Sequence, residues 1–338
     1  MIKLGVIGLG HMGGYHATAC KLIPNIELVG IADPNEENLK KIKSSKIIKT
    51  KNYSEWIDLV DGVIIAVPTT LHYKITKDCL LKGKHVLVEK PLTKNIAEAK
   101  ELFDIAEKQN LALHIGHVER FNGAVQELKK IIHNPYLIES HRVGPFAPRV
   151  QNDTVVLDLM IHDLDIILNL VDSPVKNINV VGSKVKSNLT DIAVVQISFE
   201  NGVLANIISS RASQIKQRTM SIHQSNSFIK LDFATQDIAI HRHSSNSVQI
   251  SPTQLKYKQE ETVERLFVYK ENALKLEIEN FVKSIKNGKK LTNAKNDIAA
   301  LSTTFKIEKL LEEQANDSNH SWHGQPTTRS MQKSSASQ

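Results

Sequence analysis

A glycine-rich turn near the start of the chain constrains the fold more than any other feature. Gly8-Leu9-Gly10-His11-Met12-Gly13 follows the β-branched run Ile2–Ile7 and opens a segment with helical spacing, Met12–Ile23. Three glycines at this spacing allow a tight turn, a close approach of backbone to pyrophosphate and close helix packing, and the helix N-terminus supplies N–H donors to phosphates. The turn therefore predicts a Rossmann unit that binds a dinucleotide through Gly8, Gly10, His11, Met12 and Gly13.

An acidic residue beyond the turn indicates which dinucleotide is bound. Asp33 ends the second predicted strand, Glu27–Ala32, at the usual distance of about 20 residues after the last glycine. We expect its carboxylate to accept hydrogen bonds from the adenosine ribose and to repel a 2′-phosphate. Pro34 and Asn35 offer no arginine to offset that repulsion, so the sequence favours NAD over NADP.

Short β-branched runs alternate with helical patterns over the first part of the chain, which indicates a doubly wound parallel α/β sheet. We place this Rossmann domain at residues 1–118. Pro68 and Pro91 directly follow predicted strands, so they mark loops at the carboxyl edge of the sheet, where ligands bind. The other expected elements are strands Gly62–Ala66, His85–Val88 and Ala112–Ile115 and helices Leu71–Lys82 and Asn95–Gln109.

The pattern changes after residue 118 to alternating runs that predict antiparallel strands with helices. Asn201-Gly202 is a strong signal for a tight hairpin turn, because both positions need positive φ. We assign residues 119–316 to a substrate-binding α+β domain and the polar residues 317–338 to a disordered tail. The expected elements are helices Asn122–His133, Asn272–Lys286 and Asn296–Gln314 and strands Val175–Val185, Asp191–Phe199, Val203–Ser210 and Phe228–Phe233.

Composition excludes several classes of protein. The net charge of +7 comes from dispersed lysines without interleaved aromatic residues, which favours a solvated face over a nucleic-acid platform, although it would also attract an anionic substrate. No apolar run approaches the ~18 residues of a membrane span and no signal segment precedes Ile2, so we expect a cytoplasmic protein. Cys20 and Cys79 fall in helical patterns and are expected to be buried rather than metal ligands or disulfide partners.

The tripeptide Glu89-Lys90-Pro91 follows the predicted strand His85–Val88. A surface lysine before a turn would be the simplest interpretation of the tripeptide alone. In this cleft, however, Lys90 would lie beside the expected nicotinamide position, where it can hold a substrate oxygen and stabilise charge developing on it. The remaining cofactor-site residues that we expect on this rim are Pro68, Thr69, His72 and Glu89.

An apolar segment, VVLDLMIHDLDIILNL (Val155–Leu170), carries an unusual number of ionisable residues. At 100° per residue Asp158, His162 and Asp165 share one sector of a helix, whereas Asp163 points away. A buried structural histidine and a metal site are alternatives, but no further His or Cys ligand is apparent for a metal. We favour His162 as a proton acceptor whose basicity is raised and whose position is fixed by Asp158, with Asp165 as a second support and Asp163 in a structural role only.

The ordered set of motifs resembles the Gfo/Idh/MocA family of NAD(P)-dependent oxidoreductases over residues 1–315. The resemblance rests on Gly8–Gly13, AVPTTLHYKI, EKPL and DLMIHD. It implies a catalytic group of Lys90, Asp158 and His162 and a second domain with a large open, mainly antiparallel sheet that often forms the dimer interface. Many members have Gly-Gly before the catalytic Asp, where this chain has Thr154-Val155-Val156.

A narrower resemblance, to the bacterial nucleotide-sugar branch of the family, rests on GHVERFN, RVGPFAPR and the helix sequence. It implies oxidation of a UDP-N-acetylglucosamine-like sugar at C3, in lipid A or surface polysaccharide synthesis, by a homodimer or homotetramer. Guanidinium groups bind diphosphates bidentately. The expected substrate contacts are therefore Arg120, Asn122, Arg142 and Arg149 together with Asp158 and His162. The alternatives are a family enzyme acting on inositol, a polyol or a free aldose, and a non-catalytic NAD-binding regulator.

Overall fold

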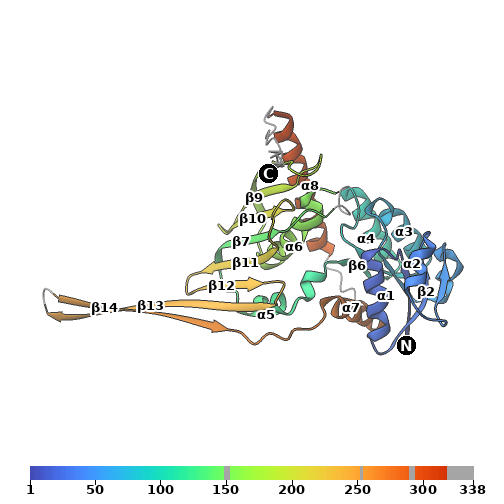
Figure 1. The fold of residues 1–338 in the computed structure, drawn as a ribbon, viewed down its shortest axis with the longest axis horizontal. Helices are drawn as coiled ribbons and strands as arrows, with labels where there is room; N and C mark the ends of the chain where they lie inside the picture. The colour runs from blue at the N-terminus through green and yellow to red at the C-terminus, as the bar shows by residue number, and fades with distance from the viewer. Residues whose placement is uncertain (148–152, 252–253, 289–293, 318–338) are drawn as a thin grey trace, which may run out of the picture.

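The computed structural model describes residues 1–147, 153–251, 254–288 and 294–317. Two sheets packed with helices lie side by side, and a long two-stranded hairpin projects from the second (Figure 1). None of the helices in these ranges is long and apolar enough to cross a membrane. Arg149 and the predicted tail from residue 318 onward lie outside the described residues.

The first sheet is parallel and has six strands in the order β3-β2-β1-β4-β5-β6. The order reverses between β1 and β4, and the carboxyl ends at such a switch point form a ligand crevice. This arrangement confirms the Rossmann prediction, although the short edge strand β3 was not predicted. The elements are β1 Ile2–Ile7, α1 His11–Leu22, β2 Ile26–Ala32, α2 Glu36–Lys41, β3 Ile48–Thr50, β4 Gly62–Ile65, α3 Thr69–Leu81, β5 His85–Glu89, α4 Ile96–Lys108 and β6 Leu113–Gly116, with 3-10 turns at Tyr53–Glu55 and Ile57–Leu59.

The second sheet has eight strands in the order β14-β13-β12-β11-β7-β10-β9-β8, and β7–β10 is its parallel pair. The prediction of a large, mainly antiparallel sheet is therefore confirmed. Residues of α5, α6 and α8 share a core with one face of this sheet. The elements are β7 Pro135–Val143, β8 Val175–Ser183, β9 Ile192–Phe199, β10 Leu204–Ser210, β11 Gln217–Gln224, β12 Ser227–Asp232, β13 Asp237–Ser251, β14 Gln254–Arg265, the 3-10 turn η3 Val118–Phe121, α5 Gly123–Ile131, the π-helical turn η5 Val156–Met160, α6 Ile161–Leu170 and α8 Ala294–Asp317.

The projecting hairpin consists of the outer parts of β13 and β14, and we call residues 242–262 the arm. β13 pairs with β12 only from Asp237 to His241, and beyond that point β13 and β14 pair with each other. In Figure 1 the arm extends far from the rest of the molecule. Neither strand of the arm was predicted from the sequence.

The helix α7, Ala273–Asn287, packs against the first sheet although it comes late in the chain. Its residues Ile278, Phe281 and Val282 share a core with strands β1 and β2. This helix belongs to the second part of the sequence but packs in the Rossmann part. A boundary at residue 118 therefore does not separate the two packed units. The assignment of residues 119–316 to a single second domain stays a prediction.

Candidate functional site

The glycine turn leaves the N-terminus of α1 open to a ligand. Gly8 has φ +86°, and a Cβ on Gly13 would lie 1.9 Å from the Gly8 carbonyl oxygen. A Cβ on Gly10, in contrast, would meet nothing within 4 Å. The first turn of a helix has N–H groups without intrahelical acceptors, and here they face the open space beside Gly10. The turn therefore fits the pyrophosphate of a dinucleotide, with exposed His11 and half-buried Met12 beside it.

Asp33 follows β2 and is bound to the glycine turn. Its Oδ2 accepts a hydrogen bond from Leu9 N at 2.6 Å and its Oδ1 accepts one from Asn35 N at 2.8 Å. Its Oδ2 also accepts a hydrogen bond from Asn38 Nδ2 at 3.2 Å. A carboxylate has about four acceptor positions, so these three bonds leave one for a ribose hydroxyl. The carboxylate thus holds the turn in shape and lies at the place expected for the adenosine ribose.

The loops after β4 and β5 form the rim of the crevice. Pro68 is exposed and Thr69 half-buried, but His72 is only 1% exposed, and its ring nitrogens lie 2.7 Å from Pro91 O and 2.9 Å from Val67 O. Burial lowers the pKa of His72, and the two carbonyl contacts oppose that shift. His72 therefore links the loops after β4 and β5 inside the protein. It can affect the cofactor only through the position of these two loops.

Glu89 and Lys90 lie at the end of β5. The Glu89 Oε1 is 2.8 Å from Nε2 of the buried His16 on α1, and the Lys90–Pro91 peptide bond is cis. Lys90 reaches the second domain: its Nζ donates to Asp158 O at 2.7 Å and to Leu157 O at 3.3 Å. The Asp158 carboxylate lies 3.8 Å from the same Nζ. The structure thus brings together Lys90 and Asp158, which are far apart in the sequence.

The segment that carries Asp158 is a π-helical turn, Val156–Met160, that leads directly into α6. Such turns occur frequently at functional sites because they redirect side chains and free backbone groups. Here the carbonyls of Leu157 and Asp158 accept hydrogen bonds from Lys90. The assumption of 100° per residue is therefore wrong between residues 156 and 160.

His162 lies near these groups, but the predicted support from Asp158 is absent. Its Nδ1 is buried and has no hydrogen-bond partner among the described residues. Burial lowers the pKa of His162 well below its usual value, and the charges of Lys90 and Arg142 lower it further. The prediction that a carboxylate raises the basicity of this imidazole is wrong, because nearby cations act on it instead. The ring is consequently neutral, which is the state that a proton acceptor needs, but the same low pKa makes it a weak base.

Two of the arginines predicted to bind substrate are held by carboxylates of α6. Arg142 is 2% exposed and contacts Asp163 at 2.8 Å and Glu119 at 2.9 Å. Arg120 contacts both Asp165 and Asp297. These pairs neutralise the guanidinium groups, so neither arginine is available to a diphosphate in the way we expected.

The predicted substrate residue Asn122 also lies inside the protein. Its Oδ1 accepts a hydrogen bond from Ala124 N at 3.1 Å and caps α5, and its Nδ2 donates to Phe233 O at 3.0 Å. The side chain is 4% exposed. The sequence motif GHVERFN therefore supplies internal contacts rather than a surface for substrate.

A possible metal cluster also has an internal partner. Ligand atoms of His117, Asp165 and Asp297 lie within 4.8 Å of one another. The Arg120 guanidinium donates to both carboxylates, however, and so occupies the position that a cation would take. We regard this group as an ion-pair cluster behind the catalytic helix.

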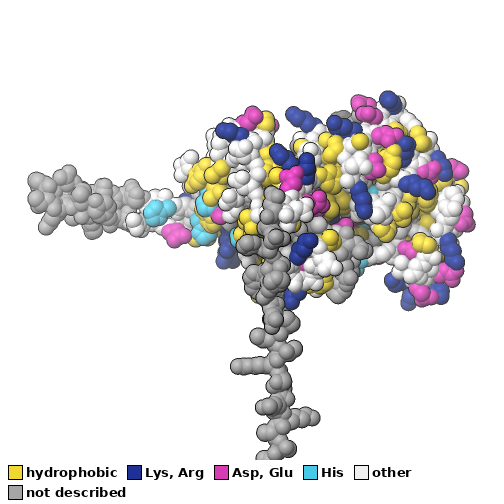
Figure 2. Space-filling view, turned by 90° about the horizontal axis from the view of Figure 1, so that it is seen from above, with side chains coloured by type: hydrophobic (Ala, Val, Ile, Leu, Met, Phe, Trp, Pro, Cys, Tyr) yellow, Lys and Arg dark blue, Asp and Glu magenta, His cyan; other side chains and the backbone are white. Residues whose placement is uncertain are grey.

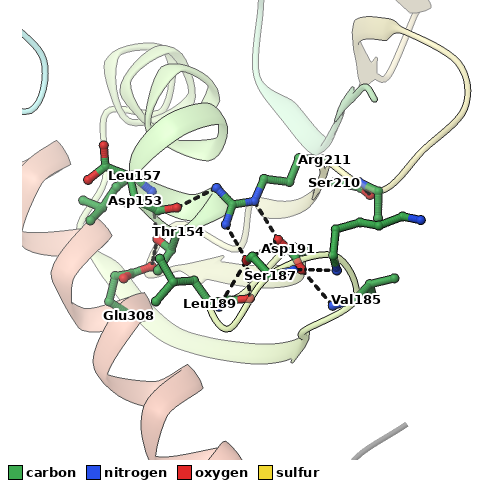
Figure 3. A network of polar contacts seen from close by, with 12 residues as sticks. Asp153, Thr154, Leu157, Val185, Ser187, Leu189, Asp191, Ser210, Arg211 and Glu308 are labelled. Atoms are coloured by element: carbon green, nitrogen blue, oxygen red, sulfur yellow. Dashed lines mark hydrogen bonds and ion pairs between the residues drawn. The ribbon is translucent and has the colours of Figure 1, made fainter. Parts of the chain in front are cut away.

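A polar network holds the chain just before the π-helical turn (Figure 3). The Arg211 guanidinium donates to Asp191 Oδ1 at 2.7 Å, to Asp153 O at 2.6 Å and to Ser187 Oγ at 3.0 Å. The other Asp191 oxygen accepts three backbone N–H groups, of residues 185, 186 and 187. Asp153 lies three residues before the π-helical turn. The network therefore positions the segment that carries Asp158.

Thr154 lies two residues before the π-helical turn. Its Oγ1 donates to Glu308 Oε1 on α8 at 2.6 Å and accepts a hydrogen bond from Leu157 N at 3.3 Å (Figure 3). Glycine could form neither bond. Thr154 thus ties the segment that carries Asp158 to α8.

A pocket of about 210 Å³ lies beside Asp158. Arg218 and Lys216, which the sequence reasoning missed, contribute to its lining. The run QIKQRTM contains both cations but matches no motif. The pairing of β11 with β7 brings them to this pocket, and the sequence alone does not predict that pairing. The lining residues are Arg142, Val143, Gly144, Pro145, Ala147, Asp158, Leu159, Arg211, Lys216 and Arg218.

Comparison with known proteins agrees with this arrangement. Residues 2–117 match the model of the oxidoreductase family with an NAD-binding Rossmann fold, GFO/IDH/MocA, and residues 123–230 match the GFO/IDH/MocA C-terminal domain. UDP-N-acetylglucosamine 3-dehydrogenase of Acidithiobacillus ferrooxidans is 31% identical over 84% of this chain and 88% of its own length. Its crystal structure superposes with a TM-score of 0.82 and 27% identity, covering 92% of this chain and 98% of the other.

Relatives with other substrates in their names also match. Glucose-6-phosphate 3-dehydrogenase of Bacillus subtilis is 32% identical over 63% of this chain and 69% of its own length. Myo-inositol 2-dehydrogenase of Thermotoga maritima is 29% identical over 62% of this chain and 69% of its own length. The chain therefore belongs to the Gfo/Idh/MocA oxidoreductase family, and its N-terminal domain is an NAD-binding Rossmann domain.

Proposed function

We propose that this protein is an NAD-dependent dehydrogenase that oxidises the C3 hydroxyl of a UDP-N-acetylglucosamine-like nucleotide sugar to a ketone. The observation that carries the proposal is the meeting of Lys90 with Asp158, beside His162, at the carboxyl edge of the Rossmann sheet. The relative that matches over most of both chains is named for this reaction. A regulator without catalysis would have no need for this group.

Each residue has a distinct role in the proposed reaction. Bound NAD would accept hydride from the sugar carbon. His162 is neutral because burial and adjacent cations lower its pKa, so it can take the hydroxyl proton. The Lys90 ammonium has three donors, of which two bond backbone carbonyls, and the third remains for the substrate oxygen. Asp158 balances the charge of Lys90 from 3.8 Å rather than orienting His162.

The preference for NAD over NADP rests on Asp33. Its carboxylate is held by Leu9 N and Asn35 N at the end of β2. A 2′-phosphate at the adjacent ribose would add negative charge beside this carboxylate, which Coulomb repulsion disfavours.

We further infer that the outer face of the second sheet binds another copy of this chain. Helices cover only the inner face. Tyr136 and Leu204 on the outer face are 54% and 51% exposed. Their exposure leaves apolar area on this face that a second copy could cover. The assembly would be a dimer or a tetramer.

A polyol such as inositol is the second candidate substrate. The pocket of about 210 Å³ is below the ~300 to 1,000 Å³ typical of ligand sites, so it suits a single ring. A nucleotide sugar would place its sugar there, with its diphosphate toward the rim and the nucleoside extending outward.

The decisive experiment compares wild type with His162→Ala. We expect wild type to reduce NAD with UDP-N-acetylglucosamine, with much lower activity on NADP. The variant should lose about 10²- to 10⁴-fold in kcat because it lacks the proton acceptor, while its NAD dissociation constant stays unchanged. NADH absorbance measures turnover, and calorimetry measures NAD binding.

The matched control is His133→Ala, which removes an exposed histidine at the end of α5. It should behave as wild type. Equal turnover of His162→Ala and wild type would contradict the role of His162, and oxidation of inositol but not of the nucleotide sugar would favour the second candidate.

A further inference from the structure

The pocket beside Asp158 contains an arginine without a partner. Arg218 is half-buried on β11, yet its guanidinium makes no hydrogen bond or ion pair within the described part of the chain. Arg142 and Arg211, which line the same pocket, are each held by carboxylates. Removing an unpaired charge from water is costly, so an unpaired half-buried arginine indicates a missing anionic partner.

The strand register places a second positive charge beside Arg218. Arg218 lies directly opposite Arg142 in the antiparallel pair β11–β7. Like charges at directly opposed positions destabilise a sheet. Asp163 and Glu119 compensate Arg142, but they leave Arg218 without a comparable contact. Burial and the Arg142 charge lower the pKa of Arg218, and the charges of Glu119, Asp163 and Asp158 oppose that shift without any of these carboxylates forming an ion pair with Arg218.

Arg218 also lies close to the reacting groups. It lines the same pocket as Asp158, and its charge is among those that lower the pKa of His162. The exposed Lys216 lies at the rim of this pocket, two residues before Arg218. An anion bound to these cations would therefore share a pocket with Asp158 of the proposed catalytic group.

We propose that Arg218, with Lys216 at the rim, forms an anion subsite that binds a phosphoryl group of the sugar substrate. The proposal rests on the proposed dehydrogenase function and narrows its substrate to a phosphorylated sugar. Guanidinium groups bind phosphoryl oxygens bidentately, whereas inositol offers no charge to either cation. The phosphoryl group could come from the diphosphate of a nucleotide sugar or from a hexose phosphate.

The test measures KM for UDP-N-acetylglucosamine, glucose 6-phosphate and myo-inositol, and Ki for inorganic pyrophosphate, in wild type and variants. Arg218→Gln should raise KM for the phosphorylated substrate and Ki for pyrophosphate by roughly 10- to 100-fold, because a charge-assisted contact is lost. KM for myo-inositol and NAD binding should change less than about threefold. Arg218→Lys, which keeps a charge on a flexible chain, should give an intermediate loss and tests the proposal if Arg218→Gln does not fold.

Arg265→Gln, which replaces an exposed arginine at the end of β14, is the control and should match wild type. Wild-type oxidation of UDP-N-acetylglucosamine with the same KM in Arg218→Gln would overturn the subsite but leave the proposed function intact. Oxidation of glucose 6-phosphate alone, with dependence on Arg218, would support the subsite and overturn the nucleotide-sugar assignment. Oxidation of inositol alone, without inhibition by pyrophosphate, would overturn both.

Discussion

The charged residues of α6 and the preceding π-helical turn differ in the partners that they contact. Asp163 and Asp165 are buried and bind arginines from other elements. Asp158 faces Lys90 and the pocket. The family resemblance grouped Lys90, Asp158 and His162, and the structure brings Lys90 and Asp158 within 3.8 Å of each other; their catalytic role stays a prediction. Residue type and spacing in the sequence could not predict which arginines would be neutralised, because the acceptors of Arg120 and Arg142 come from distant segments.

His114 on β6 allows a prediction about stability. Its Nε2 lies 3.0 Å from Ser284 Oγ on α7, and that hydroxyl donates to Asn280 O. Nε2 must therefore be the donor to Ser284, and the ring is neutral. Burial lowers the pKa of His114 to about 4. Between pH 4 and 6.5 the unfolded chain binds more protons, so the stability from this group falls as the pH falls through that window.

We expect His114→Gln, which keeps a donor for Ser284, to reduce the loss of unfolding free energy between pH 7.5 and 4.5 by about 2 to 3 kcal/mol. Urea unfolding at both pH values measures the difference. His133→Gln, at an exposed site, serves as the control. A pH dependence in His114→Gln equal to that of wild type would show that this ring does not resist protonation.

The π-helical turn is the element on which the catalytic group depends. Its start is held by Thr154, which contacts Glu308 on α8, and by the Asp191–Arg211 network. Both supports come from segments more than 30 positions away in the chain. A regular helix was predictable from the apolar spacing of residues 155–170, but the π-helical turn was not, since it is stabilised by contacts between elements.

Thr154→Val tests this support. Valine has nearly the same shape but loses the cap on Leu157 N and leaves the Glu308 carboxyl without its donor. We expect a loss of about 1 to 3 kcal/mol in unfolding free energy and a several-fold lower kcat, because Asp158 is less well positioned. Thermal unfolding and NADH absorbance measure the two effects.

Thr154→Ser keeps the hydroxyl and should remain close to wild type. Thr18→Val, which removes a hydroxyl bond to Gly14 O on the exposed side of α1, controls for the substitution itself. A Thr154→Val protein with the stability and kcat of wild type would argue against the role of this contact.

The predictability of each sheet element follows from what it packs against. Rossmann strands such as β1 and β4 were predicted because both faces are buried, which produces continuous apolar runs. The strands of the arm were missed because their sequence shows no sustained apolar alternation. β7 was missed because its inner face includes Ser140 and Arg142.

At the scale of the whole molecule, both domains contribute residues to the candidate site. Lys90 comes from the first part and Asp158 from the second. α7 returns to the first sheet and α8 contributes to the cores of both parts, through Leu301 and Ile307. The chain therefore crosses between the parts several times, which limits their relative movement and keeps the two halves of the catalytic group together.

The arm is the part of the molecule that a single chain does not stabilise. An isolated two-stranded hairpin is marginal in water. Its base adjoins rings on the outer face of the sheet: His223 and Phe228 lie 4.9 Å apart and Phe228 and His241 5.6 Å apart. Figure 2 shows histidine side chains gathered where the arm leaves the body. These features support a second copy as the partner of both arm and sheet.

We therefore expect the mass in solution to be that of a dimer or tetramer, measured by sedimentation velocity.

Replacing residues 243–261 with Asn-Gly would join the cross-strand partners Arg242 and Thr262 by a tight turn and keep the pairing of β12 with β13. This deletion should weaken assembly by at least tenfold in dissociation constant, while NAD binding is preserved because the Rossmann part is untouched. Lys230→Gln, at an exposed site on β12, is the control for surface charge. A wild-type protein with the mass of one chain at micromolar concentration would rule out this assembly, and an unchanged dissociation constant in the deletion would place the interface away from the arm.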